Sequence, residues 1–234
     1  MTHLTQPMAS GPSVVAGGQI DPAFYNADYF ERGVQTGVSG YQNYSWMPEL
    51  TLKMAHYMVM LLPMSEDETV LDYGCAKGFL VKALRTLDID ADGVDVSPYA
   101  IGQVAPEVRA HCHLVSHSGD PAVFRRAYDW MVSKDVFEHM TETELDALLA
   151  NARQNVKRIF AVIPLGRADG TGFVVPEYDR DATHVTVRPA DWWKQIFARN
   201  GWRTARFSKT FKGVKDSWTR SYPDGNGFFV LTRD

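Results

Sequence analysis

Short apolar runs alternate with amphipathic segments along most of the chain, from Thr69 to its C-terminal end. An apolar run closed by glycine or a polar turn predicts a buried strand. The expected strands cover residues 69–74, 92–97, 111–115, 128–135, 156–165, 202–211 and 227–234. Between them, apolar residues at helical spacing predict helices over residues 79–87, 98–104, 143–151 and 189–201. This alternation predicts an α/β fold with a mostly parallel sheet and helices on both faces.

The N-terminal part of the chain follows a different pattern. Residues 1–20 are rich in glycine, serine and proline and predict a poorly ordered tail. Residues 21–44 are rich in aromatics and glycine and predict a short helix and a loop. Pro48 suits the first position of a further helix, whose apolar residues recur at helical spacing up to Pro63. The sequence thus predicts three parts: a tail over 1–20, a helical segment over 21–64 and an α/β domain over 65–234.

Composition narrows the classes of function. The net charge is −4 and no long basic run occurs, which argues against a nucleic-acid partner. Two cysteines are too few for a disulfide framework and favour a reducing cytoplasm. The N-terminus lacks the pattern of a signal peptide, and the longest apolar stretch, residues 54–62, is too short to span a bilayer. We therefore expect a cytoplasmic protein without a membrane partner, and the sequence leaves its oligomeric state open.

The strongest chemical signal lies between Val70 and Phe79, in the sequence VLDYGCAKGF. Gly74 and Gly78 bracket the turn that leaves the first strand, where glycine lets the backbone approach a ligand. Asp95 ends the second strand, where a carboxylate can accept both hydroxyls of a ribose. Two other interpretations remain at this point. A nicotinamide oxidoreductase would share this layout, and a tight strand-to-helix turn that binds no ligand would also contain these glycines.

Asp72 inside the strand, the D-x-G-x-x-x-G spacing and the following GVDVS segment together resemble class I (Rossmann-like) SAM-dependent methyltransferases. The resemblance implies a seven-stranded sheet whose last strand is antiparallel, with S-adenosylmethionine (SAM) across the carboxyl ends of the strands. It also implies an N-terminal lid over residues 21–64 and the methyltransferase domain over 65–234. The cofactor-binding residues it implies are Asp72, Gly74, Cys75, Ala76, Gly78, Asp95, Val96, Ser97, Asp120, Tyr41 and Tyr44.

Several of these positions carry specific expectations. Ala76 stands where the family usually has glycine, and because alanine favours negative φ we expect a slightly altered loop. We expect Lys77 to point to solvent. Asp120 is expected to accept a hydrogen bond from the adenine amino group. The alternative is that it belongs to a solvent-exposed turn without contact to the cofactor. For Tyr41 and Tyr44, the alternative to cofactor contact is packing within the lid.

Asp135, Glu138 and His139 follow the fourth strand as D-x-x-E-H, at the position that faces the methyl group in the family. Helical spacing would place all three on one face. His139 or His184 is the candidate general base, with an acid such as Asp181 orienting the ring. The alternative role of Glu138 and His139 is helix capping and packing.

The same pattern resembles the subset of the family that binds magnesium and adds a distant second histidine. This implies a site for Mg²⁺ or Mn²⁺ formed by Asp135, Glu138, His139 and His184. The segment after the fifth strand contains D-x-x-H-V, as in small-molecule and sugar methyltransferases. We therefore expect methyl transfer to a hydroxyl or amine of a small molecule, with a sugar or sugar nucleotide as first candidates. RNA ribose 2′-O-methylation and SAM binding without turnover are the alternatives.

Overall fold

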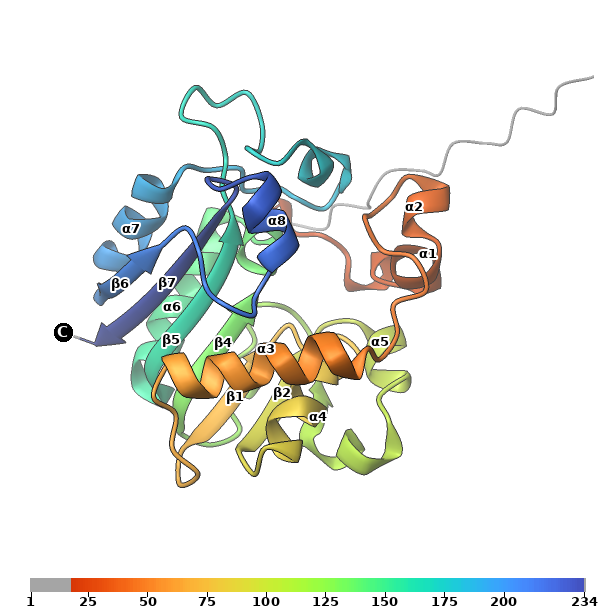
Figure 1. The fold of residues 1–234 in the computed structure, drawn as a ribbon, viewed down its shortest axis with the longest axis vertical. Coiled ribbons are helices and arrows are strands. Elements are labelled where there is room, and N and C mark those ends of the chain that lie inside the picture. Colours follow the sequence, from red (N-terminus) through yellow and green to blue (C-terminus); the bar gives the residue numbers. More distant parts are fainter. Residues whose placement is uncertain (1–17, 234) are drawn as a thin grey trace, which may run out of the picture.

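The computed structural model describes residues 18–233, and its centre is one seven-stranded sheet in the order β3-β2-β1-β4-β5-β7-β6 (Figure 1). The strands are β1 (Thr69–Tyr73), β2 (Asp90–Asp95), β3 (Cys112–Leu114), β4 (Tyr128–Lys134), β5 (Val156–Pro164), β6 (Trp202–Ser208) and β7 (Asn226–Arg233). Strands β1 to β5 pair in parallel, whereas β7 is antiparallel to both of its neighbours. The predicted Rossmann-like α/β fold, including its antiparallel last strand, is confirmed.

Helices cover both faces of this sheet (Figure 1). They are α1 (Ala27–Glu31), α2 (Gly33–Thr36), α3 (Pro48–Leu61), α4 (Phe79–Thr86), α5 (Pro98–Gly102), α6 (Glu142–Asn155), α7 (Ala190–Arg199) and α8 (Asp216–Ser221). Short 3-10 helices are η2 (Pro22–Phe24), η3 (Pro106–His111), η4 (Pro121–Val123), η5 (Phe137–His139) and η6 (Pro176–Arg180). One apolar core joins α3 and α4 to the sheet, and a second joins α6 and α7 to its opposite face. No helix within residues 18–233 combines the length and hydrophobicity needed to cross a membrane.

Local sequence explains most element boundaries. β5 reads as a continuous apolar run because both of its faces are covered, and its last six residues are buried. α6 begins at a capping box between Thr141 and Glu144, so it starts one residue earlier than expected and continues to Asn155. The third strand keeps only three residues, because His111 belongs to η3.

The N-terminal segment divides between two places. α3, in the second half of the segment expected as a lid, packs on α4 and contributes Ala55 and Met58 to the core on one face of the sheet. Residues 22–44, which we call the lid, contribute aromatic side chains to a third cluster, where they pack against Ala76, Tyr99 and Ala100. Of the expected tail over residues 1–20, residues 1–17 lie outside the described part of the chain, whereas Ile20 is buried.

Asp72 is a buried carboxyl group in β1, which lies between β2 and β4 in the sheet. It is 5% exposed in β1, and burial raises its pKa to about 7. Between the ordinary carboxyl pKa and pH 7 the folded chain therefore binds a proton that the unfolded chain releases, and stability falls as pH rises through this window.

We predict that Asp72→Asn removes this loss of stability. Its melting temperature should be close to that of the parent near pH 4 and higher by several degrees at pH 8. Each kcal/mol of unfolding free energy shifts the melting temperature by about 2–4 °C. Thermal unfolding at both pH values measures the difference, and the exposed Asp67, changed to Asn, is the matched control. An identical shift at both pH values would show that Asp72 ionises normally in the folded protein.

Candidate functional site: a cofactor cavity and a histidine cluster

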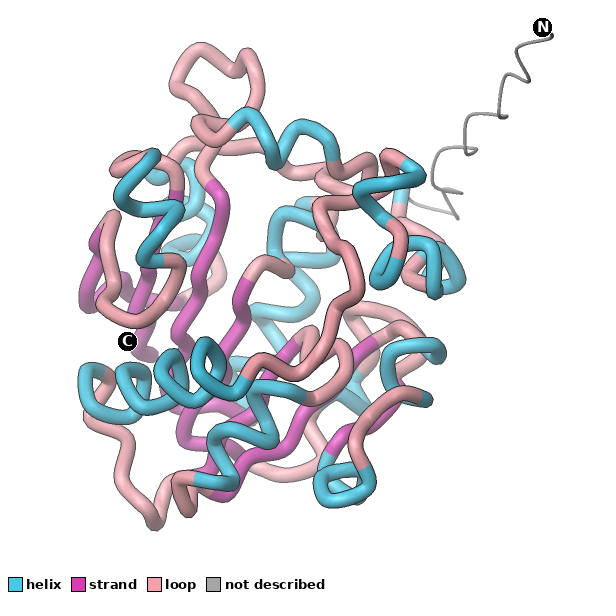
Figure 2. The backbone as a smooth tube through the Cα atoms, turned by 45° about the vertical axis from the view of Figure 1, so that its right-hand side comes forward, coloured by secondary structure: helices cyan, strands magenta, loops and turns pink. Residues whose placement is uncertain are grey.

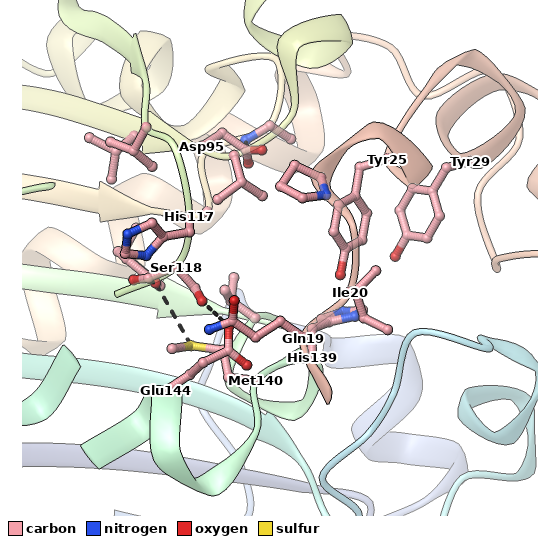
Figure 3. Close-up of a pocket in the computed structure, with 18 of the residues that line it drawn as sticks. Gln19, Ile20, Tyr25, Tyr29, Asp95, His117, Ser118, His139, Met140 and Glu144 are labelled. Carbon is pink, nitrogen blue, oxygen red and sulfur yellow. Dashed lines mark hydrogen bonds between the residues drawn. The ribbon is translucent and has the colours of Figure 1, made fainter. Parts of the chain in front are cut away.

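A cavity of about 1070 Å³, counting its open mouth, lies at the carboxyl ends of β1, β2 and β4. Figure 2 shows the loops that leave the strands at one end of the sheet, with the N-terminal helices beside them. In the close-up, Tyr25 and Tyr29 stand on one side of the cavity and His117 and Ser118 on the other (Figure 3). Residues of the loops after the first four strands and of the lid therefore line one space.

The loop between β1 and α4 passes close to neighbouring strands. A Cβ added at Gly74, whose φ is +81°, would lie 2.4 Å from Val136 Cγ2. Ala76 has a φ of +48°, so the expectation of negative φ is wrong. Its backbone N–H donates to Asp95 Oδ2 at 2.7 Å, and this bond offsets the cost of about 1–2 kcal/mol of the left-handed conformation. Gly74 and Ala76 both line the cavity.

Asp95 lies on the cavity wall at the end of β2. Oδ1 accepts the backbone N–H of Ser97 at 2.8 Å, while Oδ2 accepts that of Ala76. Burial raises the pKa of Asp95, and these backbone donors oppose the rise. Each carboxylate oxygen keeps a further lone pair, so both can accept hydroxyl groups from a ligand in the cavity.

The other expected cofactor residues divide into two groups. Tyr41 and Val96 line the cavity with the three residues already described. Those outside its lining are Asp72, Cys75, Gly78, Ser97, Asp120 and Tyr44. Asp120 instead caps η4 through Ala122 and accepts from Ser116, so its carboxylate is engaged away from the cavity. Ser116, His117 and Ser118 of the same turn line the cavity in its place.

Lys77 lies in the loop between β1 and α4, residues 74–78, which we call the cofactor loop. It fixes this loop to the lid, so the expectation that Lys77 points to solvent is wrong. It is 8% exposed, its ammonium group pairs with Glu31 of α1, and it donates to the carbonyl of Tyr44 at 2.7 Å. A second tie joins the hydroxyl of Ser97 to the carbonyl of Tyr25. The lid is therefore bonded to the loops after both β1 and β2.

The histidine pair lies where the loops after β4 and β5 meet. His139 belongs to η5, and the rings of His139 and His184 have centroids 4.5 Å apart. The two loops join because the carbonyl of Glu138 accepts the backbone N–H groups of Val185 and Thr186, at 3.0 and 2.9 Å. His139 faces the cavity, whereas His184 lies behind it.

Asp135 departs from the expected helical arrangement. Its φ is +57° and the following turn is a 3-10 helix, so the three side chains do not share an α-helical face. Its carboxylate pairs with Lys134 at 2.7 Å and with Lys215. Burial alone would raise the pKa of Asp135, but the two lysines outweigh burial and hold it well below its ordinary value. Of the four expected metal ligands, only Glu138, His139 and His184 cluster, with potential ligand atoms within 4.8 Å of one another.

Burial sets the electrostatics of this cluster. It lowers the pKa of His139 to about 4, with help from His184, so the ring is neutral at neutral pH. It raises the pKa of Glu138 well above the ordinary value, and Asp135 adds to the rise. Neither carboxyl oxygen of Glu138 has a hydrogen-bond partner among residues 18–233.

Hydrogen bonds orient both rings. His139 Nδ1 lies 2.8 Å from Thr183 Oγ1, and this hydroxyl donates to Asp181 Oδ1 at 2.5 Å. His184 Nδ1 lies 2.7 Å from the carbonyl oxygen of Tyr178, which can only accept, so Nδ1 carries the proton and Nε2 is free to bind.

Sequence reasoning missed several residues of the site. They are Met140, Glu144, Thr183 and Lys215. Thr183 had a usable signal, because it stands between Asp181 and His184 in the D-x-x-H segment. Lys215 had none, since its approach to Asp135 depends on the turn before α8.

The comparisons with known proteins agree with this geometry. The family described as "Methyltransferase domain" matches residues 47–206, which is more than half of the chain. The chain has the class I fold and belongs to this family of SAM-dependent methyltransferases. No curated protein matches it closely enough to count as a relative.

Solved structures share the fold at low sequence identity. A SAM-dependent methyltransferase from Archaeoglobus fulgidus is 14% identical, with 80% of this chain and 97% of that chain covered and a TM-score of 0.59. The pyocyanin biosynthetic protein PhzM is 15% identical, with 77% and 55% covered and a TM-score of 0.55. Human N-acetylserotonin methyltransferase in complex with SAM is 14% identical, with 76% and 51% covered and a TM-score of 0.55. The chain thus spans about half the length of the last two.

The cavity fits SAM on two observations of this structure. The backbone at Gly74 approaches the site in a conformation that leaves no room for a Cβ. The Asp95 carboxylate lies on the wall with free acceptor positions for two hydroxyl groups.

We predict that Asp95→Asn weakens SAM binding at least ~10-fold, because a hydrogen bond to a charged group contributes about 1.5–3 kcal/mol. Asp120→Asn is the matched control and should leave affinity unchanged, since its carboxylate lies outside the cavity lining. Calorimetric titration with SAM measures both, after melting curves show that each variant is folded. Equal affinity of Asp95→Asn and the parent would place the ribose acceptor elsewhere.

Proposed function

We propose that this protein transfers the methyl group of SAM to a hydroxyl group of a small molecule, with His139 as the general base. One observation carries the proposal: His139 lines the same cavity as Asp95 and Gly74. The candidate base and the candidate cofactor residues therefore face one space, which methyl transfer requires.

The chemistry assigns a distinct task to each part of the site. SAM supplies an electrophilic methyl group whose bond to sulfur breaks with both electrons passing to sulfur. His139, neutral because burial lowers its pKa to about 4, accepts the hydroxyl proton while the oxygen forms its bond to carbon. The aromatic lid residues Tyr25, Tyr29 and Phe30 cover the cavity and exclude water from the reacting atoms.

A small hydroxylated acceptor suits this site. The cavity is lined largely by apolar and aromatic residues and is bordered by the lid, a form that favours a compact substrate. Two proteins of the same fold are named as a pyocyanin biosynthetic protein and as N-acetylserotonin methyltransferase, which supports a small-molecule substrate. Sugars and sugar nucleotides are the first candidates, and an amine is the other acceptor to test.

As the alternative to His139 acting as the base, we propose that Glu138, His139 and His184 hold a divalent cation, in which case the lone pair of His139 would bind the metal and would not accept the substrate proton. The support is the unpartnered Glu138 carboxyl group, buried beside two rings whose ligand atoms lie within 4.8 Å of it. Two nitrogens and a carboxylate favour Mn²⁺ or another transition metal over Mg²⁺. A cation there would orient substrate oxygens and lower the pKa of a bound hydroxyl.

We predict that His139→Gln lowers turnover by about 10²–10⁴-fold, the usual contribution of a general base, while SAM affinity stays within about 2-fold. S-adenosylhomocysteine formation over a panel of sugars, sugar nucleotides and small hydroxylated compounds measures turnover. His56→Gln, on the exposed side of α3, is the control. Full turnover by the His139 variant on a substrate that the parent methylates would exclude His139 as the base.

We predict that the chelated, metal-free protein takes up one Mn²⁺, detected by electron paramagnetic resonance. Glu138→Gln should weaken this binding at least ~10-fold, because it replaces an anionic ligand with a neutral one. Glu142→Gln, an exposed glutamate of α6 four residues later, should bind as the parent does. Absence of uptake by the parent at millimolar Mn²⁺ would contradict the cation site and leave the role of His139 standing.

A further inference from the structure

Three side chains link the lid to the ring of His139. Tyr29 of α1 donates its hydroxyl proton to Asp181 Oδ2 at 2.9 Å. Thr183 donates to the other oxygen of Asp181, and its Oγ1 lies 2.8 Å from His139 Nδ1. We propose that Thr183 and Tyr29 are positioning residues for His139. Thr183 contacts the ring directly and Tyr29 acts through Asp181, and together they hold His139 with its proton on Nδ1 and its Nε2 free.

Counting protons fixes this tautomer. The hydroxyl of Thr183 has one proton, and at 2.5 Å from Asp181 Oδ1 that proton points to the carboxylate, which can only accept. Toward His139, Thr183 Oγ1 can then only accept, so Nδ1 must donate. A neutral imidazole carries a single N–H, and Nε2 is therefore left with its lone pair.

Asp181 is held as an acceptor by three donors. The backbone N–H of Thr183 donates to Oδ1 at 2.9 Å, in addition to the hydroxyls of Thr183 and Tyr29. Asp181 is 8% exposed and Tyr29 is 3% exposed, so water does not readily replace the tyrosine. Losing the Tyr29 hydroxyl would leave a buried carboxylate oxygen without its donor.

The lid thereby connects the cofactor loop to the histidine. The carbonyl of Tyr29 accepts the hydroxyl of Ser39 at 2.6 Å, which fixes the helix that carries the tyrosine. The same helix, α1, also carries Glu31, the partner of Lys77 in the cofactor loop. The helix that binds the cofactor loop through Glu31 is thus the helix that supplies the Tyr29 hydroxyl to Asp181. The hydrogen-bond geometry places a proton on Nδ1, whereas the catalytic use of Nε2 rests on the proposed function.

Histidine tautomers can be measured without a substrate. In protein labelled with ¹⁵N-histidine and kept in EDTA, long-range proton–nitrogen spectra distinguish a protonated from a bare ring nitrogen, and His139→Gln identifies the signal. We expect the parent to show Nδ1 protonated. Thr183→Val, which keeps the shape but removes the acceptor, should shift His139 to a mixture, and Thr183→Ser should restore the parent pattern. Tyr29→Phe should give a partial shift.

Kinetics supply the second readout. On any substrate found for the parent, Thr183→Val should lower kcat at least ~10-fold with the KM for SAM unchanged, and Thr183→Ser should recover most of it. Tyr57→Phe, on α3, is the control tyrosine. A bare Nδ1 in the parent, or an unchanged spectrum in both Thr183→Val and Tyr29→Phe, would overturn the proposal. The expected spectra without methylation of any substrate would support the positioning role and count against the proposed function.

Discussion

The cavity depends on the place of β1 in the sheet. Because β1 lies between β2 and β4, the chain leaves these neighbours toward opposite faces, and a crevice opens between their loops. Asp95 reaches this crevice from the β2 side and His139 from the β4 side. A carboxylate suited to a ribose and a ring suited to proton transfer therefore line one cavity as a consequence of strand order. The lid borders this crevice.

Enclosure depends on polar ties between segments distant in sequence. Lys77, buried in the cofactor loop, binds the lid through Glu31, and Asp181 binds it through Tyr29. Each tie is a charged group that is costly to bury without its partner. The lid is therefore held in place by groups that also shape the two halves of the site, and not only by the packing of its aromatic rings.

Features of the fold that depend on neighbouring residues in the sequence could be predicted from the sequence. Apolar runs and glycine positions located the strands, and the β1 turn with Asp95 was found because its residues are close along the chain. Side-chain partners that come from distant segments left no such pattern. Lys77 reads as a solvent-facing lysine until Glu31 is brought beside it. Asp135 reads as one of three ligands on a helix until its left-handed backbone turns it to Lys134 and Lys215.

Two carboxyl groups after β4, three residues apart in the sequence, lie in opposite electrostatic environments. Asp135 is ionised by two lysines, whereas Glu138 is buried with its oxygens unpartnered and its pKa raised. An unpartnered buried carboxyl group costs about 1–3 kcal/mol, and packing alone would be served better by an apolar residue. Pairs of groups whose environments separate their pKa values are typical of sites that perform proton or metal chemistry. Asp135 thus anchors the turn electrostatically, whereas Glu138 stays unpartnered beside the two histidines.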